Sequence, residues 1–161
     1  MNNHQELWSE ILPGLWQGGT HETDTTYDTG TSFYQPTKED FDTVITLYGS
    51  ANGAGWGVKE LRFPFYDADM TDFKVEDLLD LVNTAHRDWQ DGKRVLIRCQ
   101  AGWNRSGLVT ALTLIKDGYD PVEAIELIRE KRCPEALSNR IFANWLVAKA
   151  DLRFWRGKLA A

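Results

Sequence analysis

The chain has 161 residues, of which 42% are apolar and 12% aromatic. This is enough material for one well-buried core and little for two, so a single domain over residues 1–161 is expected, with its core at roughly residues 9–155. The net charge of −6 and the pI near 5.0 argue against nucleic acid or an anionic membrane as partners, because both bind basic surfaces.

The two cysteines, Cys99 and Cys133, do not form a disulfide framework, and a reducing, cytoplasmic setting is expected. Cys133 is expected to be a bystander thiol, with a redox pair between Cys133 and Cys99 as the alternative. Residues 1–6 lack the basic start and apolar segment of a signal peptide, and no apolar run is long enough to cross a membrane. We expect no membrane association and a monomer.

The first half of the chain predicts short strands joined by loops. Residues 11–19 hold apolar runs around Pro13-Gly14, a pattern typical of two small strands or a hairpin at a sheet edge. Residues 21–35 have no periodicity and predict an exposed loop that is either disordered or part of a binding rim. Next come a brief helical start (37–40), a strand (43–48), a glycine-rich turn (49–57) and a strand (58–63).

The second half predicts helices around one buried strand. Residues 74–90 carry apolar side chains at helical spacing, with Asp72 as a candidate cap. The strand 94–98 is apolar throughout its middle, as expected of a central strand covered on both faces. Further helices are expected at 106–116, at 121–131 behind the cap Asp120, and from the cap Ser138 to residue 150, before a loose terminus at 156–161.

Strands that alternate with helices predict an α/β fold, with a mostly parallel sheet of four or five strands and helices on both faces. In such sheets ligands bind at the carboxyl ends of the strands. The segment that follows the strand 94–98 is therefore the first place to look for a functional site.

That segment is a tight loop between strand and helix. Its five central residues can curl so that their backbone N–H groups point inward and bind an anion; they are Gln100, Ala101, Gly102, Trp103 and Asn104. An inward ring of N–H groups at the amino end of a helix is suited to a phosphoryl group.

The side chains that flank this loop predict a phosphate-handling cysteine site. The N–H dipoles, the positive end of the following helix and Arg105 all favour the thiolate of Cys99, which is the nucleophilic form. The guanidinium of Arg105 can bind two phosphoryl oxygens at once, and Ser106 can donate its hydroxyl to the sulfur. The alternative is that Cys99 is an inert buried cysteine at the end of a strand.

The Cys-x5-Arg-Ser segment from Cys99 to Ser106 resembles the signature loop of protein tyrosine phosphatases, and Ala101-Gly102 with Arg105-Ser106-Gly107 resembles the dual-specificity branch. The resemblance covers about residues 9–147. It implies hydrolysis of phosphotyrosine, with phosphoserine and phosphothreonine as further substrates, through a cysteinyl-phosphate intermediate and without metal or cofactor. The family has a histidine before the cysteine that helps to fix the loop and favour the thiolate, and this chain has Arg98 there.

The resemblance also implies an aspartate general acid about thirty residues before the cysteine, and a carboxylic acid on a nearby loop can protonate the leaving oxygen. Asp67, 32 residues before Cys99, fits best, and Asp69 is the alternative. The tail resembles the family as well: Asn139 either orients the attacking water or only begins the last helix.

Other functions stay open. Arg98 in the histidine position motivates a catalytically weak, phosphate-binding module. Phosphoinositide and RNA 5′-triphosphate substrates usually want extra basic residues in the loop, where this chain has uncharged side chains, so a phosphorylated protein or peptide is the expected partner. A rhodanese-like sulfur carrier would not need Arg105 followed by Ser106.

Overall fold

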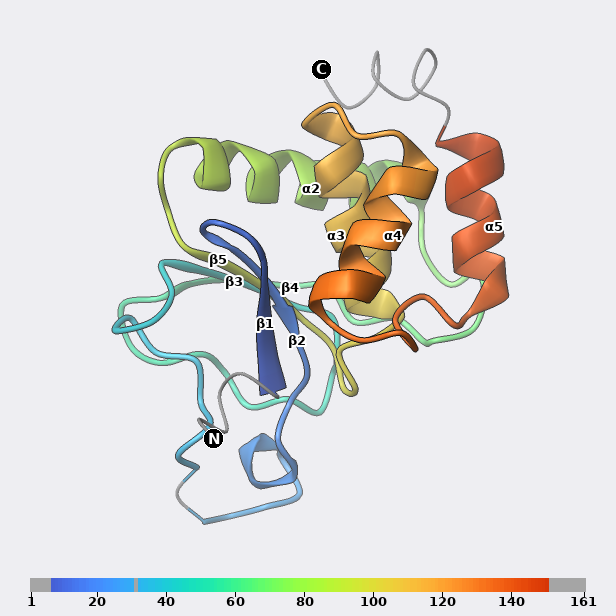
Figure 1. The fold of residues 1–161 in the computed structure, drawn as a ribbon. Coiled ribbons are helices and arrows are strands. Elements are labelled where there is room, and N and C mark those ends of the chain that lie inside the picture. Colours follow the sequence, from blue (N-terminus) through green and yellow to red (C-terminus); the bar gives the residue numbers. More distant parts are fainter. Residues whose placement is uncertain (1–6, 31, 151–161) are drawn as a thin grey trace.

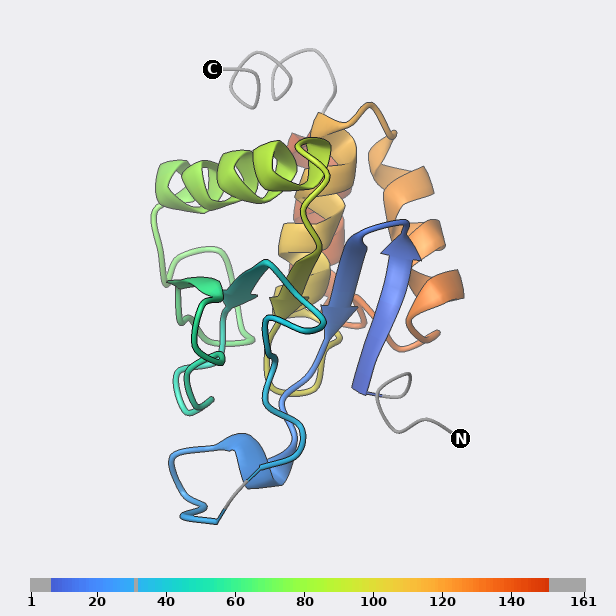
Figure 2. The same ribbon diagram turned by 90° about the vertical axis from the view of Figure 1, so that its left-hand side faces the viewer.

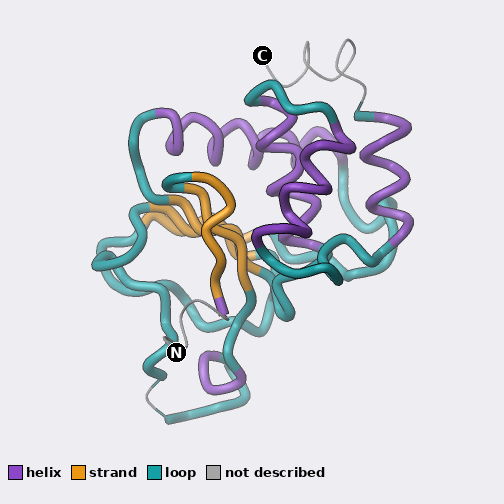
Figure 3. The backbone as a smooth tube through the Cα atoms, in the orientation of Figure 1, coloured by secondary structure: helices purple, strands orange, loops and turns teal. Residues whose placement is uncertain are grey.

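The computed structural model describes residues 7–30 and 32–150 (Figure 1). The N-terminal residues 1–6 and the predicted loose terminus at 156–161 lie outside the described residues. The elements in chain order are β1 (Trp8–Leu12), β2 (Leu15–Gly18), the 3-10 helix η1 (Glu22–Asp24), β3 (Thr43–Thr46), β4 (Lys59–Arg62), α2 (Val75–Gln90), β5 (Val95–Arg98), α3 (Arg105–Lys116), α4 (Pro121–Lys131) and α5 (Arg140–Lys149) (Figure 3).

The five strands form one sheet in the order β1-β2-β5-β3-β4. β1 runs antiparallel to β2, and the other neighbouring pairs are parallel. The β1–β2 hairpin turns at Pro13-Gly14, where Gly14 has a φ of 85°, and it forms one edge of the sheet (Figure 2). All four residues of the central strand β5 are buried. The predicted α/β fold with a mostly parallel sheet of four or five strands is confirmed.

The helices cover one face of the sheet, so the prediction of helices on both faces is wrong for the described residues. All four α-helices contribute to the main core, which also contains Leu15, Ile45 and Ile97 from the strands. The opposite face carries a small cluster of Trp8, Phe41, Val44 and Leu96, against which Leu7, Trp16 of β2 and the loop residues Ala54 and Val58 pack. Val95, Leu96 and Ile97 of β5 alternate between the two faces of the sheet, so this apolar run predicts burial on both faces but does not distinguish a covering helix from a covering loop.

Two local predictions before α2 and at its start need correction. Residues 37–40 form a turn, in which the carbonyl of Thr37 accepts from the N–H groups of Asp40 and Phe41, and no helix follows. Asp72 does not cap α2: the N-cap position is Lys74, without a side-chain cap bond. The side chain of Asp72 instead accepts a hydrogen bond from the N–H of Tyr66, 2.9 Å away.

The last helix begins one residue later than predicted. Asn139, and not Ser138, is its N-cap, and the side-chain oxygen of Asn139 accepts from the N–H groups of Ile141 and Phe142. The predicted cap Asp120 on α4 is confirmed, since its carboxylate accepts from the N–H of Val122. Amide and hydroxyl side chains are similarly good caps, so sequence alone does not choose between adjacent candidates.

Candidate active site

The loop that follows β5, taken together with Arg105 at the start of α3 (residues 99–105), is called the phosphate loop below. Cys99 is 2% exposed and its sulfur accepts a hydrogen bond from the N–H of Gly102 at 3.3 Å. Ser106 Oγ lies 3.3 Å from the same sulfur. The loop therefore brings a backbone N–H and a hydroxyl to the sulfur, as the sequence predicted, and donors of this kind stabilise a thiolate.

Gly102 is a glycine because the loop allows nothing larger. Its φ is 80°, in the left-handed region that side chains disfavour. A Cβ atom at this position would lie 2.5 Å from the carbonyl carbon of Gly18 and 2.6 Å from the nitrogen of Gly19. The phosphate loop thus packs directly against the backbone that follows β2.

The guanidinium of Arg105, the first residue of α3, is positioned by contacts with Phe65 and Tyr48. Its Nη1 donates to the carbonyl of Phe65 at 3.1 Å, and its guanidinium carbon lies 5.6 Å from the ring centre of Tyr48. Its Nε is buried and has no hydrogen-bond partner. A buried N–H without a partner is costly, and a bound phosphoryl oxygen would satisfy it.

Of the two candidate acids, Asp67 and Asp69, Asp67 is the one that contacts the phosphate loop. Its Oδ2 accepts from Asn104 Nδ2 at 2.9 Å, and its Oδ1 accepts from Asn139 Nδ2 at 2.8 Å. Asp69 is engaged within its own turn by the N–H and hydroxyl of Thr71, which lower the pKa of its carboxyl.

The side chain of Arg98 points away from the main core and from the Cys99 sulfur. Its side chain is 0% exposed and occupies the face opposite the main core, where it donates to four groups: Thr46 Oγ1 (3.0 Å), Asp24 Oδ2 (3.1 Å), the carbonyl of Asn52 (2.6 Å) and Glu60 Oε2 (3.3 Å). Burial lowers the pKa of Arg98 and raises that of Asp24, while the two carboxylates act on Arg98 in the opposite direction. Arg98 thus joins the sheet to the segment 21–30.

A cleft of about 770 Å³ opens beside Arg105. The residues that line it are mostly aromatic, small or acidic: Tyr27, Tyr48, Gly49, Ser50, Pro64, Phe65, Tyr66, Asp67, Asp72, Gln100 and Arg105. Tyr27, Tyr48 and Gln100 are shared with an adjoining pocket of about 400 Å³ that also contains Glu22. Residues 21–35 were expected to be either disordered or part of a binding rim. Tyr27, from this segment, lines both pockets, which favours the second expectation.

The other loop residues take separate positions. Gln100, Ala101 and Trp103 are exposed, and the carbonyls of Ala101 and Gly102 accept hydrogen bonds from Arg132. The contacts of Arg132 with the loop and of Asn104 with Asp67 were not expected, because they join residues 30 to 37 positions apart in the chain and no local pattern indicates them. Within residues 7–30 and 32–150, no group of three or more His, Cys, Asp or Glu side chains is placed to hold a metal ion.

A parallel sheet with a Cys-x5-Arg loop at the carboxyl end of its central strand is the arrangement of cysteine-based protein phosphatases. The family model "Dual specificity phosphatase, catalytic domain" matches residues 32–151. The chain therefore belongs to the dual-specificity phosphatase family. The predicted resemblance to the dual-specificity branch is confirmed.

Curated relatives agree with this class over part of their length. Protein tyrosine phosphatase type IVA 2 of Mus musculus is 36% identical over 77 residues, and a probable type IVA A phosphatase of Dictyostelium discoideum is 31% identical over 78 residues. Each match covers 47% of this chain and 46% of the relative. The chain thus spans about half the length of the curated relatives it matches.

Solved structures share the fold. Human DUSP28 has a TM-score of 0.69 at 19% identity, covering 94% of this chain and 97% of that chain. Tk-PTP in the active form has a TM-score of 0.57 at 29% identity, covering 69% of this chain and 81% of that chain. In the part of the chain that the structure describes, no helix combines the length and apolarity needed to cross a bilayer.

Proposed function

We propose that this chain, as one domain, hydrolyses phosphotyrosine in proteins or peptides through a cysteinyl-phosphate on Cys99. The observation that carries the proposal is the buried, unpartnered Nε of Arg105 on the same loop as a sulfur that accepts a hydrogen bond from a backbone N–H. A phosphoryl group would satisfy the first and react with the second.

In the first step the Cys99 thiolate attacks phosphorus, and an S–P bond forms as the P–O bond to the leaving group breaks. Arg105 and the N–H groups of residues 100–105 bind the non-bridging oxygens and stabilise the charge of the transition state. Asp67 transfers its proton to the leaving oxygen, which departs as an alcohol. The contacts of Asp67 with Asn104 and Asn139 support its assignment as the acid.

In the second step a water molecule attacks phosphorus and gives its proton to Asp67. The S–P bond breaks, inorganic phosphate forms and the sulfur leaves as a thiolate. The hydroxyl of Ser106, 3.3 Å from the sulfur, stabilises this leaving group by hydrogen bonding. Asn139 contacts Asp67 through its Nδ2, and in this position it orients the base rather than the water.

The cleft supports an aromatic monophosphate as substrate. Tyr27, Tyr48, Phe65 and Tyr66 offer aromatic walls, and Arg105 is the one cationic side chain among the described residues that line it. Asp67 and Asp72 would repel the additional phosphates of a phosphoinositide or an RNA 5′-triphosphate. Phosphotyrosine fits these walls better than phosphoserine or phosphothreonine, whose shorter side chains bury less apolar area.

A direct test compares phosphotyrosine, phosphothreonine and phosphoserine peptides with a phosphoinositide and an RNA 5′-triphosphate. We expect the phosphotyrosine peptide to be hydrolysed fastest, and Cys99→Ser to bind it without releasing phosphate. Asp67→Asn should slow turnover mainly for poor leaving groups; if Asp69→Asn does so instead, the acid is misassigned. Phosphate release by Cys99→Ser would remove Cys99 from the mechanism.

The proposal also covers setting and assembly. Both cysteines are free, and the net charge of −6 supports a monomer without nucleic-acid or membrane partners in a reducing, cytoplasmic compartment. Size-exclusion chromatography with light scattering tests the monomer. The alternative, a catalytically weak phosphate-binding module, rests on Arg98 in the position of the family's histidine; binding of a phosphopeptide without turnover by the wild type would favour it.

A further inference from the structure

Arg132, the C-cap residue of α4, contacts the phosphate loop from its outer side. Its Nε donates to the carbonyl of Gly102 at 3.1 Å and its Nη2 to the carbonyl of Ala101 at 3.3 Å. Its Nη1 donates to Ser9 Oγ on β1 at 3.1 Å. One guanidinium therefore joins two successive loop carbonyls to the edge strand of the sheet.

The two carbonyls belong to the peptide groups that build the anion site. The carbonyl of Ala101 shares its peptide group with the N–H of Gly102, which donates to Cys99 Sγ at 3.3 Å. In a trans peptide the C=O and N–H point in opposite directions. Fixing the oxygen of Ala101 on the outside therefore fixes the N–H of Gly102 toward the sulfur.

The next peptide group is fixed in the same way. The carbonyl of Gly102 accepts from Arg132 and also from Nε2 of the buried Gln17 at 3.1 Å. The N–H of Trp103 belongs to this peptide group and is turned to the opposite, inner side. Glycine at 102 makes the loop backbone permissive, so bonds to the outer carbonyls are needed to prevent a peptide flip.

Arg132 also adds positive charge near the sulfur. Burial lowers the pKa of its guanidinium, and its interactions with Cys133 and Cys99 act in the opposite direction. The guanidinium is close to the loop, because a Cβ atom at Gly102 would lie 2.8 Å from its Nη2. Arginine stays protonated in proteins, so this charge is permanent.

We propose that Arg132 is a positioning residue for phosphate binding: it binds the outer carbonyls of Ala101 and Gly102 so that the N–H groups of Gly102 and Trp103 face Cys99 and the phosphoryl group. This inference deepens the proposed function and rests on it for its catalytic consequence. In the family, a histidine before the cysteine helps to fix the loop. Arg98 occupies that position here but lies on the other face of the sheet, so we assign the fixing of the loop to Arg132.

The test measures the ionisation of Cys99 directly. In a Cys133→Ser background, the rate of iodoacetamide alkylation of Cys99 is followed from pH 4 to 9, with and without vanadate. Arg132→Gln should raise the pH midpoint by about one unit. It should also weaken protection by vanadate, and lower kcat/KM for p-nitrophenyl phosphate by about 100-fold.

Arg132→Lys separates charge from geometry, because an ammonium group keeps the charge but does not bridge two carbonyls as a guanidinium does. It should leave the alkylation midpoint closer to wild type, yet weaken vanadate protection by about tenfold. If Arg132→Gln does not fold, Arg132→Lys alone tests the proposal. Ser9→Ala removes a contact outside the loop and should change the alkylation midpoint and the protection by vanadate little.

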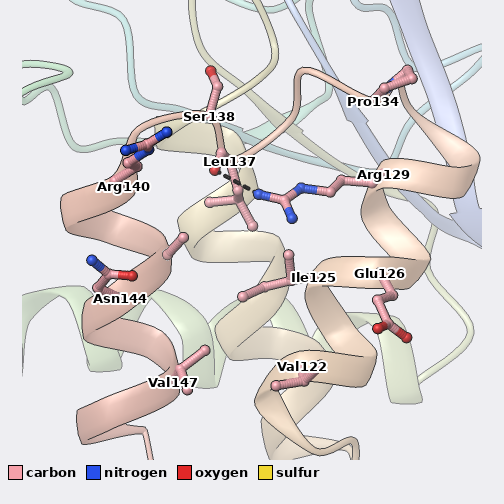
Figure 4. Close-up of a pocket in the computed structure, with 11 residues that line it drawn as sticks. Val122, Ile125, Glu126, Arg129, Pro134, Leu137, Ser138, Arg140, Asn144 and Val147 are labelled. Atoms are coloured by element: carbon pink, nitrogen blue, oxygen red, sulfur yellow. Dashed lines mark hydrogen bonds between the residues drawn. The ribbon is translucent and has the colours of Figure 1, made fainter.

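The matched control is Arg129, one turn earlier on α4, at the edge of a groove of about 580 Å³ between α4 and α5 (Figure 4). Its guanidinium donates to the carbonyls of Ala136 and Leu137, not to the phosphate loop. Arg129→Gln removes the same charge from the same helix. It should lower the melting temperature while leaving the alkylation midpoint of Cys99 unchanged.

Two outcomes would overturn the proposal: folded Arg132→Gln with a wild-type midpoint and wild-type vanadate protection, or equal shifts in Arg132→Gln and Arg129→Gln. Failure of the proposed function gives a different result. The wild type would then release no phosphate from any substrate, while the midpoint and vanadate protection would still depend on Arg132.

Discussion

Replacing Arg98 with methionine tests how the buried ion cluster supports the fold. Methionine keeps much of the apolar stem but removes four donated hydrogen bonds and the positive charge. The side chains of its two carboxylate partners are 2% (Asp24) and 16% (Glu60) exposed, so water replaces the lost cation poorly. Breaking a buried ion pair on one side costs about 3–5 kcal/mol, a large part of the stability of a domain of this size.

The loss should depend on pH in a defined direction. Burial already raises the pKa of Asp24 with Arg98 present, and without the cation it rises further above its unfolded value. A group with a raised folded pKa favours the folded state when it is protonated, below its unfolded pKa, and opposes it as the pH rises through the folded pKa. The stability deficit of Arg98→Met should therefore be largest at pH 7 and shrink as the pH falls toward 5.

The assay is urea unfolding at pH 7 and pH 5, with Arg62→Met as control. Arg62 contacts the same oxygen of Glu60 at 3.2 Å and also donates to the carbonyls of Gly49 and Ala51, but its side chain is 36% exposed, so its removal should cost clearly less than that of Arg98. In folded Arg98→Met the alkylation midpoint of Cys99 should match wild type, because Arg98 lies on the opposite face. A deficit below about 1 kcal/mol at pH 7, or one that grows at pH 5, would refute the reasoning.

Three further predictions concern single side chains. Gly102→Ala should destabilise the fold by about 2–4 kcal/mol in urea unfolding, since a methyl group meets backbone atoms at 2.5 Å and a φ of 80° is strained; wild-type stability would contradict this. Asn139→Ala should lose about 1 kcal/mol of α5 capping, whereas Asn139→Ser keeps the cap; both should slow turnover of poor leaving groups, and normal turnover by both would exclude a role through Asp67. Hydrogen bonds from Arg94 lower the pKa of Asp42, so this carboxylate stabilises the fold above its unfolded pKa; the stability gap between wild type and Asp42→Asn should close as the pH falls below about 4, and a constant gap would count against it.

Family and class could be predicted from the sequence because the evidence is local. The residues to which we assign the chemistry of the phosphate loop are Cys99, Gly102, Arg105 and Ser106. They lie within eight residues; the Cys99 sulfur contacts Gly102 and Ser106 at 3.3 Å, and Arg105 begins α3. The alternation of strand and helix patterns likewise predicted the parallel sheet. These features follow from backbone geometry over a few residues, and a reader of the sequence needs no distant contact to infer them.

The tertiary structure decided what depends on contacts between distant segments. Three aspartates share the segment 67–72, and only packing brings Asp67 to Asn104 and Asn139. Arg98 is the last residue of β5, and the alternation of side chains along this strand places it opposite the main core, where it pairs with Asp24, 74 residues earlier in the chain. Arg132 meets the loop only because α4 packs beside the β1–β2 hairpin; such contacts are set by sheet order and side-chain packing, which no local pattern encodes.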